Sequence, residues 1–269
     1  MKNRIFIFLI RILNTFISKD HSQLKNKITA NFNDHIGSEI QTNGFYESFY
    51  LKNIIPYLNK QVFYDTMLDV GANIGNHSVF FSNYFNRIYS FEPQKTTYKL
   101  LEINTERIPN IKTFNYGISS SNLKRELFIN SKNRGMVSGQ KIDDFYFKEE
   151  VQFKPFKIKN EEKISYIKID VEGNEIDVLK ALKAIIIKDH PIISFEFNDH
   201  HTKENIEDLL NGYGYQNFYV FNRDVLKGFL SKVNFNKLAR LRKTPIDKSK
   251  NYGIVFTFSE SSLYKLNGI

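Results

Sequence analysis

The chain has 269 residues and contains no cysteine and no tryptophan. Without cysteine it forms no disulfide, and no thiolate is available as a zinc ligand or a catalytic nucleophile. It also has no hydrophobic run long enough for a transmembrane helix, because Arg11 interrupts the apolar stretch that begins at Ile5. Arg11 also divides the region in which a secretory signal would carry its apolar core. We therefore expect a globular, cytoplasmic protein, since a reducing compartment suits a chain without disulfides.

Positive charge is concentrated in two peripheral segments. The chain carries a net charge of +9, to which residues 1–30 contribute +5 and residues 223–250 contribute +7. The rest of the chain is slightly acidic, so the basic character belongs to surfaces beside the fold. Two interpretations stay open for residues 1–19. They form either an amphipathic helix on an anionic membrane, which would place the protein at its inner face, or an arm that packs on the domain or on a second copy in a homo-oligomer.

A strand, a glycine turn and a helix are predicted in the sequence TMLDVGANIGNHSVFF, residues 66–81. A short apolar run leads into Gly71, Asn73 and Gly75, which form a tight turn ahead of an amphipathic helix. The next apolar strand ends at Glu92, 21 residues after Gly71. In dinucleotide-binding folds an acidic residue at a spacing of about 20 meets the ribose hydroxyls. The pattern therefore predicts a site for an adenosine-containing cofactor at the carboxyl ends of a parallel sheet.

The same turn argues against a nicotinamide cofactor. A G-x-G-x-x-G fingerprint requires glycine where this chain has Asn73 and Asn76. D-V-G-A-N-I-G resembles instead the first motif of the class I S-adenosylmethionine methyltransferases. That resemblance implies that Glu92 holds the ribose and that the acidic residue and the turn surround the methionine part of the cofactor. The residues so implied are Asp69, Gly71, Asn73 and Gly75.

Three further motifs narrow the family. They are F-E-P at Phe91 to Pro93, N-Y-G-I-S at Asn115 to Ser119 and K-I-D-V-E-G at Lys168 to Gly173. Together with the glycine turn they resemble the FkbM family of methyltransferases, over about residues 65–214. This resemblance implies a Rossmann-like methyltransferase, usually one that methylates oxygen on sugars or sugar-bearing natural products. It also implies that the loop carrying Ser119 touches the adenine.

The expected fold is α/β, the class I methyltransferase (Rossmann-like) open sheet. Its sheet should be mostly parallel with a C-terminal antiparallel strand, and a helical extension should precede it. Residues 1–44 are expected to form this N-terminal helical arm and a connector. Residues 45–269 are expected to form the methyltransferase domain, with a basic insertion at 223–250. Leu238 and Leu241 in this insertion are spaced to share one side of a helix.

Polar residues that follow two neighbouring strands are the candidates for the acceptor side. Asp170 is expected at the carboxyl end of its strand, on the same face as Lys168 because alternate residues share a face. Glu196 ends the next strand, and His200 follows it. Because removing a hydroxyl proton requires a base within reach, Asp170 and His200 are the predicted catalytic residues. A Mg²⁺ ion held by Asp170 and Glu196 would instead lower the pKa of the hydroxyl.

The leading functional prediction is an S-adenosylmethionine-dependent O-methyltransferase. Its acceptor would be a sugar hydroxyl of a polysaccharide, a glycolipid or a nucleotide-linked sugar. An RNA methyltransferase is the enzymatic alternative, suggested by the positive charge and by the 15 Tyr and 25 Phe residues. The charge lies outside the predicted catalytic region, however, and no N-P-P-Y-like motif is present, so nucleic acid is not the expected partner. A non-catalytic scaffold that kept the fold is the remaining alternative.

Overall fold

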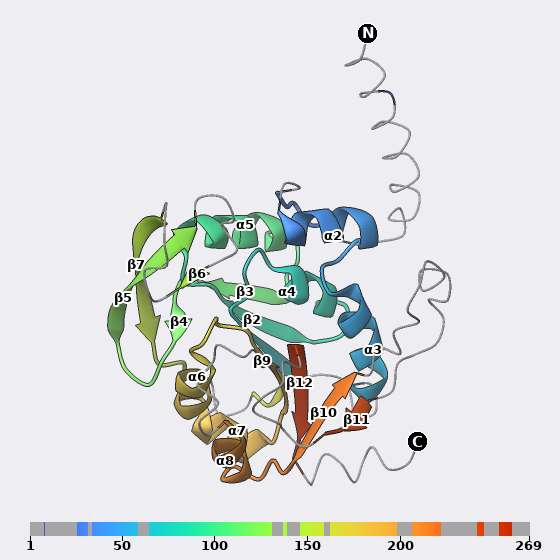
Figure 1. The fold of residues 1–269 in the computed structure, drawn as a ribbon, viewed down its shortest axis with the longest axis vertical. Coiled ribbons are helices and arrows are strands. Elements are labelled where there is room, and N and C mark those ends of the chain that lie inside the picture. The colour runs from blue at the N-terminus through green and yellow to red at the C-terminus, as the bar shows by residue number, and fades with distance from the viewer. Residues whose placement is uncertain are drawn as a thin grey trace.

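The computed structural model describes residues 8, 26–31, 34–58, 65–130, 137–138, 146–158, 162–197, 206–221, 241–244 and 253–259. Figure 1 shows an open central sheet with helices on both sides of it and a smaller sheet beside it. Within these ranges no helix is long and apolar enough to span a membrane.

The central sheet has eight strands in the order β11-β10-β12-β9-β8-β1-β2-β3. Strands β9, β8, β1, β2 and β3 are parallel neighbours, whereas β12 is antiparallel to both β9 and β10. The expected fold class is thereby confirmed. The prediction that Leu241 lies in a helix is wrong, because Leu241 begins a strand that pairs with β10. The strands are β1 (Thr66–Val70), β2 (Arg87–Phe91), β3 (Ile111–Phe114), β8 (Ile164–Ile169), β9 (Ile192–Phe197), β10 (Asn217–Phe221), β11 (Leu241–Lys243) and β12 (Gly253–Phe258).

Helices seal both faces of this sheet. Because parallel strands are covered on both faces, every residue of β1 is buried. Met67 packs into the hydrophobic cluster of α3 and α4, whereas Leu68 and Val70 pack into that of α6, α7 and α8. The strand ends are therefore where the sheet remains open to a ligand. The helices are α2 (His35–Asn43), α3 (Ser48–Leu58), α4 (Asn76–Phe81), α5 (Lys95–Thr105), α6 (Glu175–Ala181), α7 (Lys183–Asp189) and α8 (Ile206–Asn211).

A second sheet, which is not part of the expected fold, lies beside the first (Figure 1). Its strands run in the order β4-β7-β5-β6, with β5 and β7 as a long antiparallel pair. Arg125 of β5 anchors it to α6, because its guanidinium donates to Asn174 Oδ1 at 2.7 Å and to Asp177 Oδ2 at 3.0 Å. The strands are β4 (Gly117–Ile118), β5 (Leu123–Asn130), β6 (Val137–Ser138) and β7 (Tyr146–Lys154).

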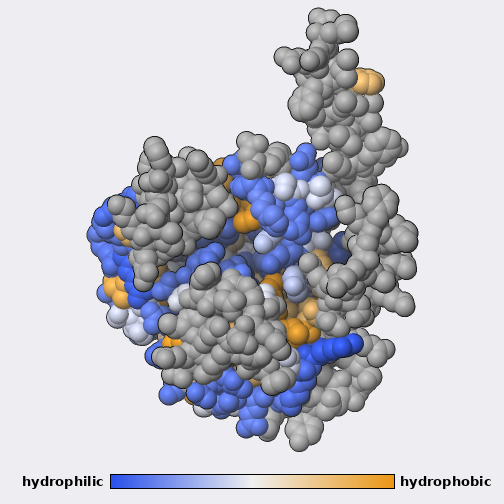
Figure 2. Space-filling view, viewed as in Figure 1, coloured by the Kyte–Doolittle hydropathy of each residue, from blue (hydrophilic) through white to orange (hydrophobic). Residues whose placement is uncertain are grey.

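Helix α2 precedes the domain and has defined caps. Asp34 accepts the Gly37 amide hydrogen at 2.7 Å, and the helix ends at Gly44, whose φ is 83°. Residues 1–19 lie outside the described residues except for Phe8, so their membrane interpretation stays a prediction. The boundary between the arm and the domain also stays a prediction. Figure 2 shows a mostly hydrophilic surface on the face drawn, with hydrophobic residues visible near its middle.

Candidate active site

The glycine turn after β1 is packed between the ends of two strands. It is left-handed at three positions, with φ of 75° at Gly71, 51° at Asn73 and 91° at Gly75. The Gly71 amide donates to Phe91 O at 3.0 Å, which ties the turn to β2. A Cβ at Gly71 would lie 1.8 Å from Asp170 O, so only glycine lets the turn approach the end of β8 this closely. The predicted turn is confirmed.

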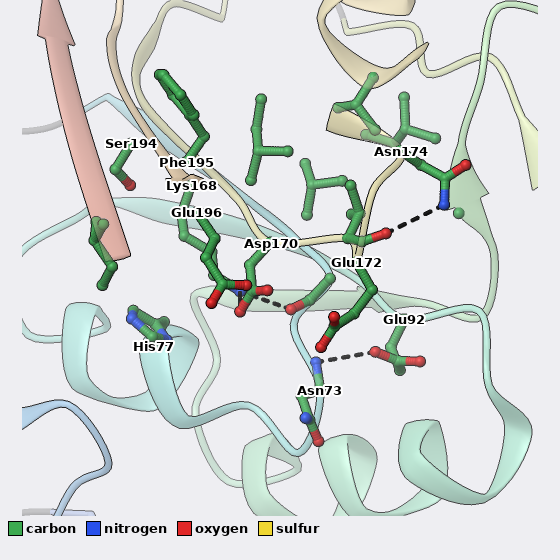
Figure 3. A pocket seen from close by; sticks show the side chains of 18 of the residues that line it. Asn73, His77, Glu92, Lys168, Asp170, Glu172, Asn174, Ser194, Phe195 and Glu196 are labelled. Atoms are coloured by element: carbon green, nitrogen blue, oxygen red, sulfur yellow. Dashed lines mark hydrogen bonds and ion pairs between the residues drawn. The ribbon is translucent and has the colours of Figure 1, made fainter. Parts of the chain in front are cut away.

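A pocket lies at the carboxyl ends of β1, β8 and β9 (Figure 3). It is bordered by the glycine turn, by the beginning of α3 and by strands of the second sheet. Five of the residues predicted from the sequence line it: Gly71, Asn73, Glu92, Asp170 and Glu196. The structure therefore brings three of the six predicted cofactor residues and two predicted acceptor residues into one cavity.

Asp69, also predicted to hold the cofactor, lies beneath the turn and does not line this pocket. Its side chain is fully buried, and its Oδ2 accepts from the Ser78 hydroxyl at 2.5 Å. Its Oδ1 lies 3.4 Å from Lys168 Nζ. Asp69 thus supports the turn through the residues around it.

Gly75 and Ser119 are two further predicted cofactor residues that are not among those lining the pocket. Gly75 faces α5, because a Cβ there would lie 2.8 Å from Leu101 Cδ1. Ser119 is buried, and its amide donates to Lys154 O at 3.0 Å. Gly75 therefore serves the packing of the turn on α5, and Ser119 joins β4 to β7. A direct contact of either with the cofactor stays a prediction.

Glu92 lies at the cofactor end of the pocket and orders the turn. Its Oε2 accepts from the Asn73 amide at 3.0 Å (Figure 3). Its Oε1 accepts from the Gln94 amide at 2.9 Å. Burial raises the pKa of Glu92 to about 7, although these two amides act to lower it. Each carboxylate oxygen has a second lone pair, so Glu92 can still accept a hydrogen bond from a ligand hydroxyl.

Three carboxylates gather at the other end of the pocket. One oxygen of each of Asp170, Glu172 and Glu196 lies within 4.8 Å of the others (Figure 3). Burial, followed by the charges of Asp170 and Glu196, raises the pKa of Glu172 to about 7. Oxygen ligands of this kind suit a hard divalent cation, so the donor set fits the Mg²⁺ expected at Asp170 and Glu196 and adds Glu172. The ion itself stays a prediction.

Lys168 links the acidic end to the glycine turn. Its ammonium donates to Gly71 O at 2.7 Å and lies 3.4 Å from one oxygen each of Asp69 and Asp170. Burial alone would lower the pKa of Lys168, but the carboxylates of Asp170 and Asp69 raise it above its ordinary value. Lys168 is therefore a buried group that is charged at neutral pH. The predicted shared face of Lys168 and Asp170 agrees with their contact.

Glu47 and His77 line the same pocket but are absent from the predicted site. Glu47 Oε2 lies 3.4 Å from His77 Nε2. His77 carries a signal in the sequence, because it stands at the start of the helix that follows the glycine turn. Glu47 stands just before the helix that precedes the first strand, a position from which it could reach the cofactor, but the sequence does not indicate its contact with His77. His200, the second predicted catalytic residue, lies outside the described residues.

Comparison with known protein families identifies the family of this chain. The model of the methyltransferase FkbM domain matches residues 69–217, which is more than half of the chain. A curated relative, the hexuronic acid methyltransferase AglP of Haloferax volcanii, is 29% identical over 126 residues. That match covers 44% of this chain and 50% of AglP, so the chain spans half the length of this relative.

Two solved structures are similar at low sequence identity. Methyltransferase FkbM from Methylobacillus flagellatus KT gives a TM-score of 0.43 at 14% identity, covering 92% of this chain and 59% of that one. Precorrin-6y C5,15-methyltransferase from Geobacter metallireducens GS-15 gives 0.40 at 12% identity, covering 76% and 87%. The family match, and not these two structures, decides the identity. The chain belongs to the FkbM methyltransferase family.

Proposed function

We propose that this protein transfers the methyl group of S-adenosylmethionine to a hydroxyl oxygen of a sugar. The observation that carries the proposal is the single pocket that joins Glu92 and the glycine turn to the carboxylates at the ends of β8 and β9. One end offers backbone amides and a buried acid to an adenosine-containing molecule. The other end offers three carboxylates and the ammonium of Lys168 to the acceptor, which suits a molecule rich in hydroxyl groups.

Different residues of the pocket would bind the cofactor and remove the acceptor proton. When bound, S-adenosylmethionine supplies an activated methyl group. Gly71, Asn73 and Glu92 would hold it, and the acidic side chains beyond them complement its positive charge. The acceptor must be held in line with the methyl group and must lose one proton, so positioning and proton removal are what the protein contributes. Asp170, predicted from the sequence, and Glu47 are the carboxylates placed to receive that proton.

We further propose that the acceptor sugar carries no negative charge. The relative AglP is named for a hexuronic acid, which is an anionic sugar. The pocket of this chain is lined by Glu47, Asp170, Glu172 and Glu196, with Lys168 as the cation near them. A second anion placed among these carboxylates would be repelled. The same argument disfavours RNA, whose phosphates are anionic.

A divalent cation is the second part of the proposed chemistry. Asp170, Glu172 and Glu196 would hold Mg²⁺, because their oxygens lie within 4.8 Å of one another. The ion would stabilise the negative charge that develops on the acceptor oxygen. A rate with Mg²⁺ that is roughly tenfold or more above the rate with EDTA supports this part, and equal rates in both would contradict it.

Transfer to defined acceptors tests the proposal. The purified full chain is incubated with S-adenosylmethionine and p-nitrophenyl glycosides of glucose, galactose, rhamnose and glucuronic acid, with either Mg²⁺ or EDTA. A mixed-sequence RNA oligonucleotide is the comparison. Mass spectrometry should detect a methyl ether on at least one neutral glycoside, at a higher rate than on the glucuronide. Methylation of RNA alone, or of none of the glycosides, would contradict a sugar acceptor, and preference for the glucuronide would contradict a neutral one.

A further inference from the structure

The turn before α3 is clamped to the helix that carries His77. The Tyr46 amide donates to Asn76 Oδ1 at 2.9 Å, and Asn76 Nδ2 donates back to Tyr46 O at 2.9 Å. This reciprocal pair fixes the backbone of one segment against the side chain of the other. Glu47 follows Tyr46, and His77 follows Asn76. The clamp therefore holds Glu47 and His77 in a defined relative position.

The backbone of Glu47 is in a conformation that L-residues rarely adopt. Its φ is 55°, and its amide donates to Glu39 Oε1 at 3.1 Å. A residue in this region of φ persists only where its surroundings hold it, and such residues cluster at functional sites. Here the result is a carboxylate in the pocket, with its Oε2 3.4 Å from His77 Nε2 and 22% of the side chain exposed.

The surroundings of Glu47 and His77 shift their pKa values in opposite directions. Burial, followed by the charge of Asp170, raises the pKa of Glu47 to about 7. Burial, followed by the charge of Lys168, lowers the pKa of His77 to about 4. Near neutral pH His77 is therefore uncharged, and Glu47 exchanges its proton readily. The charged groups that act on Glu47 come from α2, β8 with the residue after it, and β9: Glu39, Lys168, Asp170 and Glu196.

We propose that Glu47 is the base that removes the acceptor proton and that His77 is its positioning residue. The inference rests on the proposed hydroxyl acceptor. The acceptor O–H bond breaks, and its proton goes to the Glu47 carboxylate. The oxygen uses the freed electron pair to bond the methyl carbon, and the C–S bond breaks with its electron pair remaining on sulfur. Glu47 then returns the proton to solvent, and His77 holds the carboxylate in place.

Glu47 is better suited to this role than Asp170. Asp170 Oδ2 lies 3.4 Å from the ammonium of Lys168, so this carboxylate is already engaged in an ion pair. Glu47 faces the neutral imidazole of His77 instead. A general base is most effective when its pKa lies near the working pH, which is the case for Glu47.

The pH dependence of transfer tests this assignment. With the neutral p-nitrophenyl glycoside that reacts fastest and saturating S-adenosylmethionine, kcat/KM should rise with pH through about 7, because only ionised Glu47 accepts a proton. Glu47→Gln should lower kcat/KM by roughly 10²- to 10⁴-fold and remove this rise. Asp170→Asn should retain the rise but move it to lower pH, because the charge of Asp170 raises the pKa of Glu47. Glu106→Gln is the matched control, since Glu106 lies at the end of α5 and does not line the pocket.

His77 variants separate positioning from folding. His77→Gln keeps a hydrogen-bond donor, and its kcat/KM should rise with pH near the same value as in the wild type. His77→Leu removes the ring nitrogen that lies 3.4 Å from Glu47 Oε2, so kcat should fall further than in His77→Gln while the pH of the rise stays the same. A rise that persists in Glu47→Gln, or that is lost in Asp170→Asn alone, would overturn the inference.

A measurement without acceptor keeps the inference testable if no glycoside reacts. In protein labelled with ¹³C at the glutamate carboxyl carbons, one resonance that titrates near 7 should be missing from Glu47→Gln. Such a resonance supports the Glu47 assignment even if the sugar acceptor is wrong. If Glu47→Gln removes no resonance that titrates near neutral pH, the inference fails whatever the acceptor is.

Discussion

Gly71→Ala is expected to abolish the binding of S-adenosylmethionine. A Cβ at this position would lie 1.8 Å from Asp170 O and 2.8 Å from the Asp170 carbonyl carbon, and φ is +75°. The obstacle is backbone, so no side chain can rotate away. Either the glycine turn or the end of β8 must move, and both border the pocket. Calorimetric titration should detect at least about a 100-fold loss of affinity, which corresponds to about 2.7 kcal/mol.

Gly214→Ala is the matched control for this variant. Gly214 also has a positive φ, +91°, but a Cβ there would meet nothing within 4 Å. It should therefore show only the backbone cost of the left-handed conformation, about 1–2 kcal/mol of unfolding free energy, and should bind S-adenosylmethionine normally. Normal binding by Gly71→Ala would contradict the position assigned to the turn.

Lys168→Met is expected to lower the free energy of unfolding by about 3–5 kcal/mol. Lys168 lies 3.4 Å from both Asp69 and Asp170, and Asp69 is fully buried. Removing the ammonium leaves the Asp69 carboxylate in the interior without its cation, and it removes the hydrogen bond to Gly71 O. Urea unfolding followed by circular dichroism measures the loss.

Two further variants show whether the loss comes from the buried charge. Asp69→Asn in the Lys168→Met background removes the uncompensated carboxylate and should recover part of the lost stability. Lys124→Met breaks a pair with Glu150 in which both side chains are about 60% exposed, and it should change stability by less than about 1 kcal/mol. Equal losses in Lys168→Met and Lys124→Met would contradict a structural role for the buried pair.

Local patterns in the sequence were sufficient to predict the scaffold of the site. The glycine turn follows from Gly71 and Gly75, because few other residues adopt positive φ without strain. The contact of Lys168 with Asp170 follows from the two-residue alternation along a strand, which any strand obeys. The position of Glu92 at the end of β2 was predictable from its spacing, because the acidic residue lies about 20 residues after the glycine turn in such folds.

Contacts set by the tertiary structure were not predictable. Asp69 and Lys168 meet because β1 and β8 pair with these two residues opposite each other, a register between strands almost a hundred residues apart in sequence. The sequence therefore did not indicate that Asp69 supports the turn from below. Glu47 and His77 meet through the clamp between Tyr46 and Asn76, which depends on where α3 enters the fold. The second sheet also depends on pairing between β5 and β7, which are separated by a long connection.

Calorimetric titration of the wild-type chain with S-adenosylmethionine, and in parallel with NAD, tests the central claim most directly. The account predicts binding of S-adenosylmethionine and no binding of NAD. Glu92→Ala should weaken the binding by roughly 10- to 100-fold, because a hydrogen bond to a charged group contributes about 1.5–3 kcal/mol. Failure of the folded wild-type protein to bind S-adenosylmethionine would contradict the account and favour a scaffold that has lost its chemistry.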